Sequence, residues 1–257
     1  GYDVPLSADE NTASVAAQSL LDFLDINRGF DIKINKNIKP GSGIGSSAAS
    51  AVGAVYGVNK LLGSPLRKHE LIKFAMQGEF VSSKSAPADN VASCLHGGLI
   101  LVNNREKYNV VNLPVPENLY AVVHHPHIEI KTSESRVILP KAVDLKTASD
   151  QLASIGGFIH SLHTADYDLM RIVLNDYLVE QYRSEHVPFF KQIKNISESK
   201  NVICCSISGS GPSVFSLVEG KNMAKKLKSI HDEVYIKNSV EFNSYVTPLN
   251  AKGVHAV

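Results

Sequence analysis

The amino-acid sequence predicts an α+β fold, in which helices and strands form separate layers. Stretches that alternate apolar and polar residues, as half-buried strands do, are interspersed with pairs of stretches at helical spacing. They do not follow the strict strand–helix–strand order that indicates a parallel sheet. A loop rich in glycine and serine joins one predicted strand to one predicted helix. With 257 residues, the chain is long enough for one large domain or two modest ones.

Two kinds of spacing predict the elements of the first half. The segment Phe30-Asp31-Ile32-Lys33-Ile34 alternates apolar and polar residues, which predicts a strand. Val55, Val58 and Leu62 recur three and four residues apart, which predicts a helix after the glycine-rich loop. In chain order we expect a helix over 11–24, a strand over 30–34, a helix over 46–62, a helix over 65–83, a short helix within 84–98 and a strand over 99–102.

The second half begins after Pro114-Val115-Pro116, the best candidate for a linker. We therefore expect an N-terminal domain over 1–113 and a C-terminal domain over 117–257. A second glycine loop, Ser208-Gly209-Ser210-Gly211-Pro212-Ser213, lies between two predicted strands. In chain order we expect a strand over 119–124, helices over 145–163, 165–183 and 187–197, strands over 202–207 and 214–218, a helix over 221–230, and strands over 233–237 and 240–248.

Composition and charge exclude several classes of function. Hydrophobic residues make up 44% of the chain and charged residues 20%, which is ordinary for a globular protein in water. A net charge of +1, with both signs interspersed, argues against nucleic acid or an anionic membrane as the main partner. No apolar run approaches the about 20 residues that span a membrane. Cys94, Cys204 and Cys205 are typical of small buried side chains in a reducing compartment, so we expect a cytoplasmic enzyme.

The most informative segment is Pro40-Gly41-Ser42-Gly43-Ile44-Gly45-Ser46-Ser47-Ala48-Ala49. At the start of a helix, free backbone N–H groups and the positive end of the helix dipole form an anion site. Glycines allow the backbone to approach a ligand, and serine hydroxyls can reach a phosphate or its metal. No Lys occurs between Lys39 and Lys60, so this is not a P-loop, and Ser46 stands where the dinucleotide fingerprint needs a glycine. The segment predicts a phosphate site of another kind; the alternative is a Gly/Ser turn that caps a helix.

Glu79 is the second informative residue. On a helix over 66–83, it falls in the apolar stripe that contains Ile72 and Met76. A buried carboxylate is costly unless it meets a cation or hydrogen-bond donors. Mg²⁺ binds oxygen ligands, usually one or two carboxylates plus substrate phosphates, which fits Glu79 near the glycine loop. The alternative is that the helix ends near Gly78 and that Glu79 is solvated.

Two further pairs of residues are open between a structural and a functional role. Asp89 and Asn90 place an acid and an amide between small residues, which is typical of turns and N-caps but can also orient a substrate hydroxyl. Arg136 and Arg183 each stand alone in a mixed stretch, where most arginines are exposed. Both would bind a carboxylate through their planar guanidinium groups only if the fold brings them together.

Three segments together resemble the GHMP kinase superfamily of small-molecule kinases. They are the phosphate-binding segment over 40–49, the Asp89-Asn90 loop and the C-terminal glycine segment over 207–215. The chain is also similar to the homoserine kinase branch in Ala88-Asp89-Asn90-Val91-Ala92 followed by Gly97-Gly98, in Ser135-Arg136-Val137-Ile138-Leu139-Pro140, and in Tyr182-Arg183. The similarity extends over nearly the whole chain, in the family's order.

The resemblance implies a two-layer GHMP-kinase-like fold. Its N-terminal half would have the topology of ribosomal protein S5 domain 2, and its C-terminal half would be an α/β sandwich. It also implies an ATP site between the halves and phosphoryl transfer from ATP, with Mg²⁺, to the side-chain hydroxyl of L-homoserine, a step toward threonine. The family's habit implies a homodimer. The alternatives are a kinase for another small alcohol, such as mevalonate or shikimate, and a nucleotide-binding homologue without catalysis.

The resemblance further implies roles for the residues that match the family's motifs. The ATP phosphates would be wrapped by Pro40, Gly41, Ser42, Gly43, Ile44, Gly45, Ser46 and Ser47. Glu79, with Ser47 or Ser46, would hold Mg²⁺. Asp89 and Asn90 would approach the homoserine hydroxyl and amino group, with Asn90 rather than a strong base at the hydroxyl. Arg136 and Arg183 would bind the carboxylate, and Gly209, Ser210 and Gly211 would border the site.

Two features depart from the family's pattern. Pro87 stands where the family has a His two residues before its Asp, so one substrate hydrogen bond is not expected. The family's first motif, an N-terminal strand and loop that touch substrate, does not precede Gly1. We therefore expect the protein to be longer by about 50 residues, the size of one further sheet layer with its connections.

Overall fold

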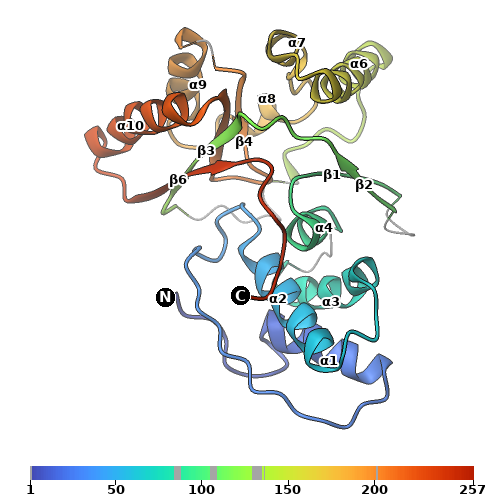
Figure 1. Cartoon of the computed structure of the whole chain (residues 1–257). Coiled ribbons are helices and arrows are strands. Elements are labelled where there is room, and N and C mark those ends of the chain that lie inside the picture. The colour runs from blue at the N-terminus through green and yellow to red at the C-terminus, as the bar shows by residue number, and fades with distance from the viewer. Residues whose placement is uncertain (1, 84–87, 105–108, 129–134, 136, 201) are drawn as a thin grey trace. The chain divides into compact units, whose positions relative to one another are not determined.

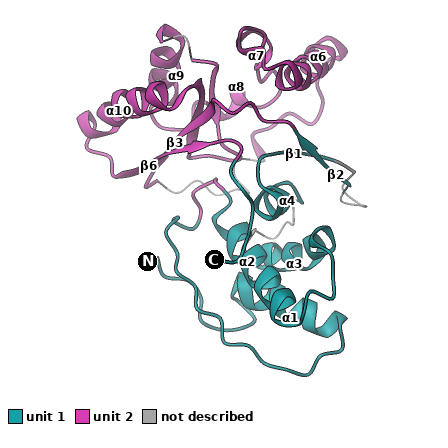
Figure 2. Ribbon diagram, viewed as in Figure 1, with its two compact units in different colours: residues 1–40, 45–113, 251–257 teal, residues 41–44, 114–250 magenta. Residues whose placement is uncertain are grey.

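A computed structural model describes residues 2–83, 88–104, 109–128, 135, 137–200 and 202–257 of the chain (Figure 1). The chain divides into two compact units, which Figure 2 shows in different colours. The first unit comprises residues 1–40, 45–113 and 251–257, and the second comprises 41–44 and 114–250. The second unit thus contains residues 41–44 of the glycine-rich segment over 40–49, the first glycine loop. The domain limits 1–113 and 117–257 stay predictions, because compact units are not folding domains.

The first unit is mainly helical. Its elements are α1 (Thr12–Phe23), α2 (Ser46–Leu61), a 3-10 helix (Lys68–Leu71), α3 (Ile72–Ser83), α4 (Ala88–His96), and the antiparallel strands β1 (Leu99–Asn104) and β2 (Asn109–Leu113). Gly78 lets α3 approach α1 closely, because a Cβ there would lie 2.3 Å from the Thr12 carbonyl oxygen and 2.9 Å from Ala16 Cβ. Small residues therefore let these helices pack at short range around one core.

The predicted strand over 30–34 is wrong. Residues 26–37 form neither helix nor strand. The alternation sorts the side chains only in part, since Phe30 and Ile34 pack against the core whereas Ile32, which the same pattern places on that face, is 37% exposed. A strand, however, needs a neighbour for its backbone hydrogen bonds. Among the described residues no strand pairs with this segment, so it forms no ladder.

The second unit is built on a four-stranded antiparallel sheet in the order β4-β5-β3-β6. Its elements are β3 (Leu119–Pro126), α6 (Leu145–Thr164), α7 (Tyr167–Val173), α8 (Glu180–Arg183), α9 (Phe190–Ser199), β4 (Cys204–Ile207), β5 (Val214–Glu219), α10 (Lys221–Lys237) and β6 (Phe242–Pro248). Phe190 and Ile193 of α9 and Tyr235 of α10 share one core with Cys205 and Val214 of the sheet. These two helices therefore cover one face of the sheet.

Several predicted elements of the chain have different limits in the structure. The predicted strand over 233–237 is wrong, because these residues are the last turns of α10, where Val234 and Tyr235 are buried. Packing against the sheet here overrides the strand preference of β-branched and aromatic residues. The predicted helix over 165–183 is broken into α7 and α8, and β2 was not predicted. The helix predicted from residue 65 begins later, because Ser64 has a left-handed φ of 60°.

The α+β class predicted from the sequence is confirmed, since helices and antiparallel sheets occur in both units. Within the described part of the chain, no helix combines the length and the apolar character that a membrane crossing requires.

Helix α10 of the second unit carries a buried imidazole that contacts α9. His231 is 1% exposed, and its Nε2 lies 3.1 Å from the Ser197 hydroxyl oxygen. Ser197 donates its single proton to the Ile193 carbonyl oxygen at 2.9 Å, so Nε2 of His231 is the donor and Nδ1 carries the lone pair. Burial, together with the neighbouring His124, lowers the pKa of His231 to about 3. Protonation would add a charge and an N–H group that the interior does not satisfy.

We expect the free energy of unfolding to fall as the pH drops below about 6.5. The unfolded chain then binds a proton at His231, whereas the folded chain does not bind it until about pH 3. This residue alone contributes a slope of about 1.4 kcal/mol per pH unit. Urea unfolding at about pH 7 and about pH 5 measures the effect. His231→Gln should flatten the slope, and His163→Gln, at an exposed position, should keep it; an equal slope in both variants would contradict the assignment.

Candidate active site

Helix α2 begins directly after three glycines in the left-handed conformation. Gly41, Gly43 and Gly45 have φ angles of 75°, 75° and 76°, which residues with a side chain rarely adopt. Gly45 is the N-cap of α2 and supplies no side-chain hydrogen bond. The first N–H groups of a helix have no partner within it, so this end of α2 offers them, with the positive end of the dipole, to an anion.

Lys36 fixes the first turn of α2 through hydrogen bonds. It is 8% exposed, and its Nζ donates to the Ser46 carbonyl oxygen and, at 2.6 Å, to the Ser50 hydroxyl. The Ser46 hydroxyl donates to the Ile38 carbonyl oxygen at 2.7 Å. The Ser46 side chain is therefore engaged in packing the loop, which leaves Ser47 as the serine that faces the neighbouring acid.

Glu79 is that acid. It is 3% exposed, and α3 continues past it to Ser83, so its predicted burial is confirmed and the solvated alternative is excluded. Burial raises the pKa of Glu79, while a hydrogen bond from the Ser47 side chain and the charge of Lys36 act in the opposite direction. The charge of Asp89 raises the Glu79 pKa further. The carboxylate is thus desolvated but faces a hydroxyl and an ammonium group.

Helix α4 brings two more groups to this place. Asp89 and Asn90 lie exposed in its first turn, where Asp89 Oδ1 accepts a hydrogen bond from the Asn90 N–H at 2.8 Å. Cys94 Sγ lies 3.9 Å from the Gly45 carbonyl oxygen, and burial together with the Glu79 charge raises the Cys94 pKa to about 11. Cys94 is therefore a neutral thiol under the loop. Lys36, Ser47, Glu79 and Asp89 thus form one electrostatic cluster in the first unit.

Lys36 and Cys94 were not predicted as parts of this site. In a P-loop the phosphate-binding lysine follows the glycines in the sequence. Lys36 precedes them, and nothing in the sequence distinguishes it from Lys33 and Lys39. Only the tertiary structure distinguishes Lys36, because the fold buries it against the first turn of α2.

The other part of the first glycine loop packs against the second glycine loop, within the second unit. The Ser213 hydroxyl donates to the Ser42 carbonyl oxygen at 2.5 Å, and the Ser208 hydroxyl donates to the Gly43 carbonyl oxygen at 2.9 Å. Pro40 is exposed just before these residues, and Ile44 is half-buried just after them. The Ser42 hydroxyl is buried and has no hydrogen-bond partner among the described residues, so it can bind an incoming oxygen.

Arg183 holds the second glycine loop from α8. Its Nη1 donates to the Gly209 carbonyl oxygen at 2.6 Å, and its Nε donates to the Ser135 carbonyl oxygen at 3.4 Å. The Ser135 hydroxyl in turn donates to the Ser210 carbonyl oxygen at 3.1 Å. Gly211 is buried, with its N–H bonded to the Ser208 carbonyl oxygen at 2.9 Å. The structure thus brings Arg183 to Gly209, Ser210 and Gly211; Arg136 and Pro87 lie outside the described residues.

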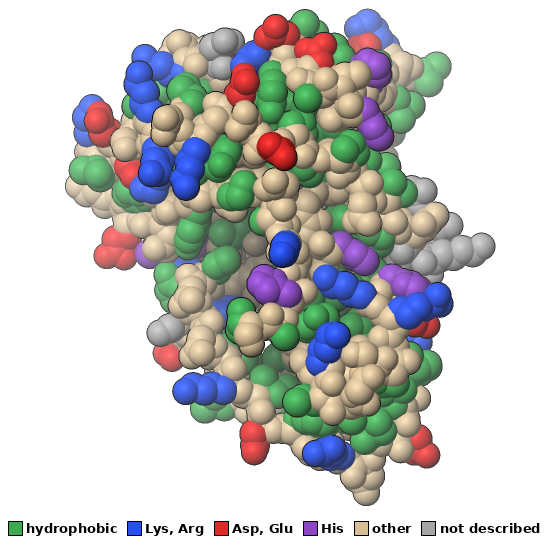
Figure 3. All heavy atoms as spheres, in the orientation of Figure 1, with side chains coloured by type: hydrophobic (Ala, Val, Ile, Leu, Met, Phe, Trp, Pro, Cys, Tyr) green, Lys and Arg blue, Asp and Glu red, His purple; other side chains and the backbone are tan. Residues whose placement is uncertain are grey.

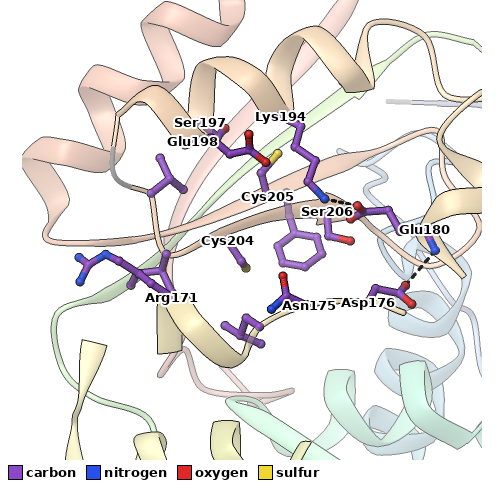
Figure 4. A pocket seen from close by; sticks show the side chains of 14 residues that line it. Arg171, Asn175, Asp176, Glu180, Lys194, Ser197, Glu198, Cys204, Cys205 and Ser206 are labelled. Carbon is purple, nitrogen blue, oxygen red and sulfur yellow. Dashed lines mark hydrogen bonds and ion pairs between the residues drawn. The ribbon is translucent and has the colours of Figure 1, made fainter. Parts of the chain in front are cut away.

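A cavity of about 310 Å³ in the second unit is lined by residues that include parts of α8, α9 and β4 (Figure 4). At its rim Lys194 of α9 forms an ion pair with Glu180 of α8. Asp176 accepts hydrogen bonds from the N–H groups of Leu178, Val179 and Glu180 at 2.9, 2.8 and 3.1 Å. A helix of four residues has little stability of its own, so these bonds hold the helix that carries Arg183.

The arrangement in the first unit suits an anion accompanied by a hard cation. Backbone N–H groups at a helix start bind phosphate oxygens, and a buried carboxylate beside a hydroxyl is an oxygen donor set of the kind that Mg²⁺ prefers. In the described ranges, no three His, Cys, Asp or Glu side chains converge on a common point. A cation held by Glu79 would therefore need further ligands from the anion itself.

Two segments of the chain match family profiles. Residues 11–98 match the GHMP kinases N terminal domain, and residues 158–237 match the GHMP kinases C terminal domain. A homoserine kinase of Chlorobium phaeobacteroides is 33% identical over 100% of this chain and 83% of that protein. The homoserine kinase of Sulfolobus acidocaldarius is 38% identical over 89% of this chain and 75% of that protein.

Solved structures agree with these matches. The crystal structure of homoserine kinase from Cytophaga hutchinsonii has a TM-score of 0.93 and 40% sequence identity, covering 97% of this chain and 79% of that chain. The mevalonate kinase of L. major, in complex with R-mevalonate, has a TM-score of 0.71 and 17% identity, covering 95% of this chain and 78% of its own. At that identity the second similarity concerns the fold alone.

Gly43 and Gly41 form a matched pair for testing the contact between the two glycine loops. A Cβ at Gly43 would lie 2.6 Å from the Gly211 carbonyl oxygen, whereas one at Gly41 meets nothing within 4 Å, and both residues have a φ of 75°. Gly41→Ala should lose about 1 kcal/mol of unfolding free energy to left-handed strain. Gly43→Ala should lose about 1–3 kcal/mol more, because backbone must move. Equal losses in urea unfolding would show that the loops do not touch at Gly43.

Proposed function

The chain belongs to the GHMP kinase family, and from that premise we propose that it transfers the γ-phosphate of ATP to the side-chain hydroxyl of L-homoserine. The product is O-phospho-L-homoserine, an intermediate on the way to threonine. Relatives that are 33% and 40% identical over 97% or more of this chain are homoserine kinases, which supports this acceptor.

The single observation that carries the proposal is that Glu79 of α3 lies beside the start of α2. The Glu79 carboxylate is 3% exposed and accepts a hydrogen bond from the Ser47 side chain in the first turn of that helix. Its burial is explained if a phosphate and its cation bind there. Residues 40–47 would wrap the phosphates, with N–H groups at the start of α2 as donors. The unsatisfied Ser42 hydroxyl offers one further donor.

Glu79 and Ser47 would hold Mg²⁺. The donor set fits, because both groups are oxygens and the ion keeps room for phosphate and water ligands. Ser46 is the poorer candidate, since its hydroxyl is bonded to the Ile38 carbonyl oxygen. A bound Mg²⁺ would neutralise charge on the phosphate oxygens during transfer. Lys36 contributes by fixing the carbonyl oxygen of Ser46, and with it the direction of the first turn.

Three described residues are proposed to bind the acceptor. Asp89 and Asn90, exposed in the first turn of α4, would face its hydroxyl and amino group. Arg183 would bind the carboxylate from the edge of the second glycine loop, where its guanidinium group lies against Gly209; Arg136 is included on the sequence resemblance alone. Phosphoryl transfer depends mainly on positioning and charge neutralisation. A neutral Asn90 at the hydroxyl is therefore sufficient, and no strong base is required.

We also propose a cytoplasmic location. Cys94, Cys204 and Cys205 are free thiols, which suits a reducing compartment. A second candidate function is phosphorylation of another small alcohol by the same machinery, because mevalonate kinases share this fold at low identity.

Glu79→Gln tests the role of the buried acid. The amide keeps the shape of the side chain but removes the charge, so we expect kcat to fall about 100-fold or more while nucleotide affinity is partly retained. A coupled ADP-release assay and nucleotide titration measure the two quantities. Glu233→Gln, at a solvent-exposed ion pair on α10, is the matched control and should keep both. A Glu79→Gln enzyme with normal kcat would exclude Glu79 as a metal ligand.

The acceptor is tested by ADP release with L-homoserine, mevalonate and shikimate in parallel. We expect turnover with L-homoserine only, because Arg183 and Asp89 would together recognise an amino acid by its carboxylate and amino group. Arg183→Lys should raise KM for homoserine by about 10-fold or more, since lysine lacks the planar pair of donors. Turnover of another alcohol with none of homoserine would favour the second candidate function.

A further inference from the structure

Residues 251–254, called here the 251–254 segment, belong to the first unit and cap the C-terminal end of α4. The Val254 N–H donates to the Cys94 carbonyl oxygen at 2.9 Å, and the Gly98 N–H donates to the Ala251 carbonyl oxygen at 3.0 Å. Figure 1 shows this segment, in red, passing α4. The last four carbonyl groups of a helix have no partner within the helix. The segment therefore supplies a bond that α4 cannot make by itself.

Two glycines let the backbones meet at this place. An isolated antiparallel bridge pairs Gly97, directly after α4, with Lys252. A Cβ at Gly97 would lie 2.2 Å from the Gly253 nitrogen, and a Cβ at Gly253 would lie 2.4 Å from the Leu95 carbonyl oxygen. Because the obstructing atoms are backbone atoms on both sides, any side chain here would force the segment and the end of α4 apart.

Side chains strengthen the same contact. Val254 packs against the core of the first unit, and Lys68 donates from Nζ to the Val254 carbonyl oxygen at 3.2 Å. Burial, with the charges of Lys68 and His69, lowers the pKa of His96 in the last turn of α4. Figure 3 shows Lys, Arg and His side chains gathered on the face that carries α4 and the C-terminal residues. Cationic groups near the C-terminal end of a helix interact favourably with its dipole.

Helix α4 depends on such contacts for its position. It has 9 residues, and a helix of this length is not stable alone. Val91 and Leu95 are buried in the core, but apolar packing is not directional, whereas hydrogen bonds are. The bonds from the 251–254 segment therefore fix the position of α4 along its own axis. Asp89 and Asn90, in the first turn, move with that axis.

We propose that the 251–254 segment is a positioning element for the acceptor alcohol. It sets α4, and through α4 it sets where Asp89 and Asn90 meet the acceptor. The inference rests on the proposed function, which assigns those two residues to the acceptor. The nucleotide would be bound by residues 40–47 at the start of α2, so its affinity depends less on α4. Disturbing the segment should thus weaken acceptor binding more than nucleotide binding.

Steady-state kinetics of the full-length protein test this difference. Gly253→Ala should raise KM for homoserine about 10-fold and change KM for ATP less than about twofold. The matched control is Gly29→Ala, because a Cβ there meets nothing within 4 Å and neither glycine has a left-handed φ; it should keep both constants. An equal rise in the two constants, or no rise in either, would overturn the positioning role.

Lys68→Met provides a second variant that introduces no backbone clash. It removes the donor to the Val254 carbonyl oxygen, so KM for homoserine should rise about threefold. Lys60→Met is its control. The ammonium groups of Lys60 and Lys68 lie 5.7 and 5.8 Å from the centre of the same Tyr56 ring. Equal KM values for homoserine in the two variants would contradict the role of the Val254 bond.

Amide hydrogen exchange without substrates separates this inference from the proposed function. Gly253→Ala should speed exchange in α4 about 10-fold and leave α10 of the second unit unchanged, because only α4 loses its cap. Unchanged exchange in α4 would overturn the inference whatever the acceptor is. A wild-type protein that turns over no homoserine would instead overturn the proposed function, and faster exchange in α4 would then still support the cap.

Discussion

The carboxylate of Glu79, buried beside the first turn of α2, is the constraint on which the candidate site depends. An isolated charge at this depth is unfavourable, and burial accordingly raises the Glu79 pKa. The Ser47 side chain and the charge of Lys36 oppose that effect. The surrounding helices are placed to make this possible, because Gly78, next to Glu79 in α3, lets α3 lie directly against α1.

Lys36 connects this electrostatic arrangement to the backbone. Its ammonium group is fixed by the Ser46 carbonyl oxygen and the Ser50 hydroxyl, so it stabilises α2 and Glu79 at the same time. Burial lowers the Lys36 pKa, and the Glu79 charge raises it. Each of these two buried charges therefore reduces the cost of the other. A phosphate at the start of α2 would meet a turn whose geometry is already set, which lowers the entropic cost of binding.

The first glycine loop belongs to both compact units by its contacts. Residues 41–44 pack with the second glycine loop, whereas Gly45 and the residues after it belong to the helical unit. Only glycine can serve at Gly43, where the Gly211 carbonyl oxygen leaves no room for a Cβ. Arg183 fixes the second loop in turn, and α8 is itself held by Asp176 and by the Lys194–Glu180 ion pair. Few of these residues would take part in the reaction directly, yet they set the shape of the loops that would bind substrate.

The sequence by itself determined the parts of this protein that depend on local spacing. The α+β class, α1, α2, the left-handed glycines before α2 and the burial of Glu79 all follow from periodicity and from backbone freedom. The tertiary structure decided what depends on a distant partner. The alternation over 30–34 could not reveal that no described strand pairs with it, and Val234 and Tyr235 at the end of α10 are helical because they pack on the sheet. Lys36 became part of the site only because the fold buries one of three similar lysines, since burial is set by all the elements around a residue and not by its neighbours in sequence.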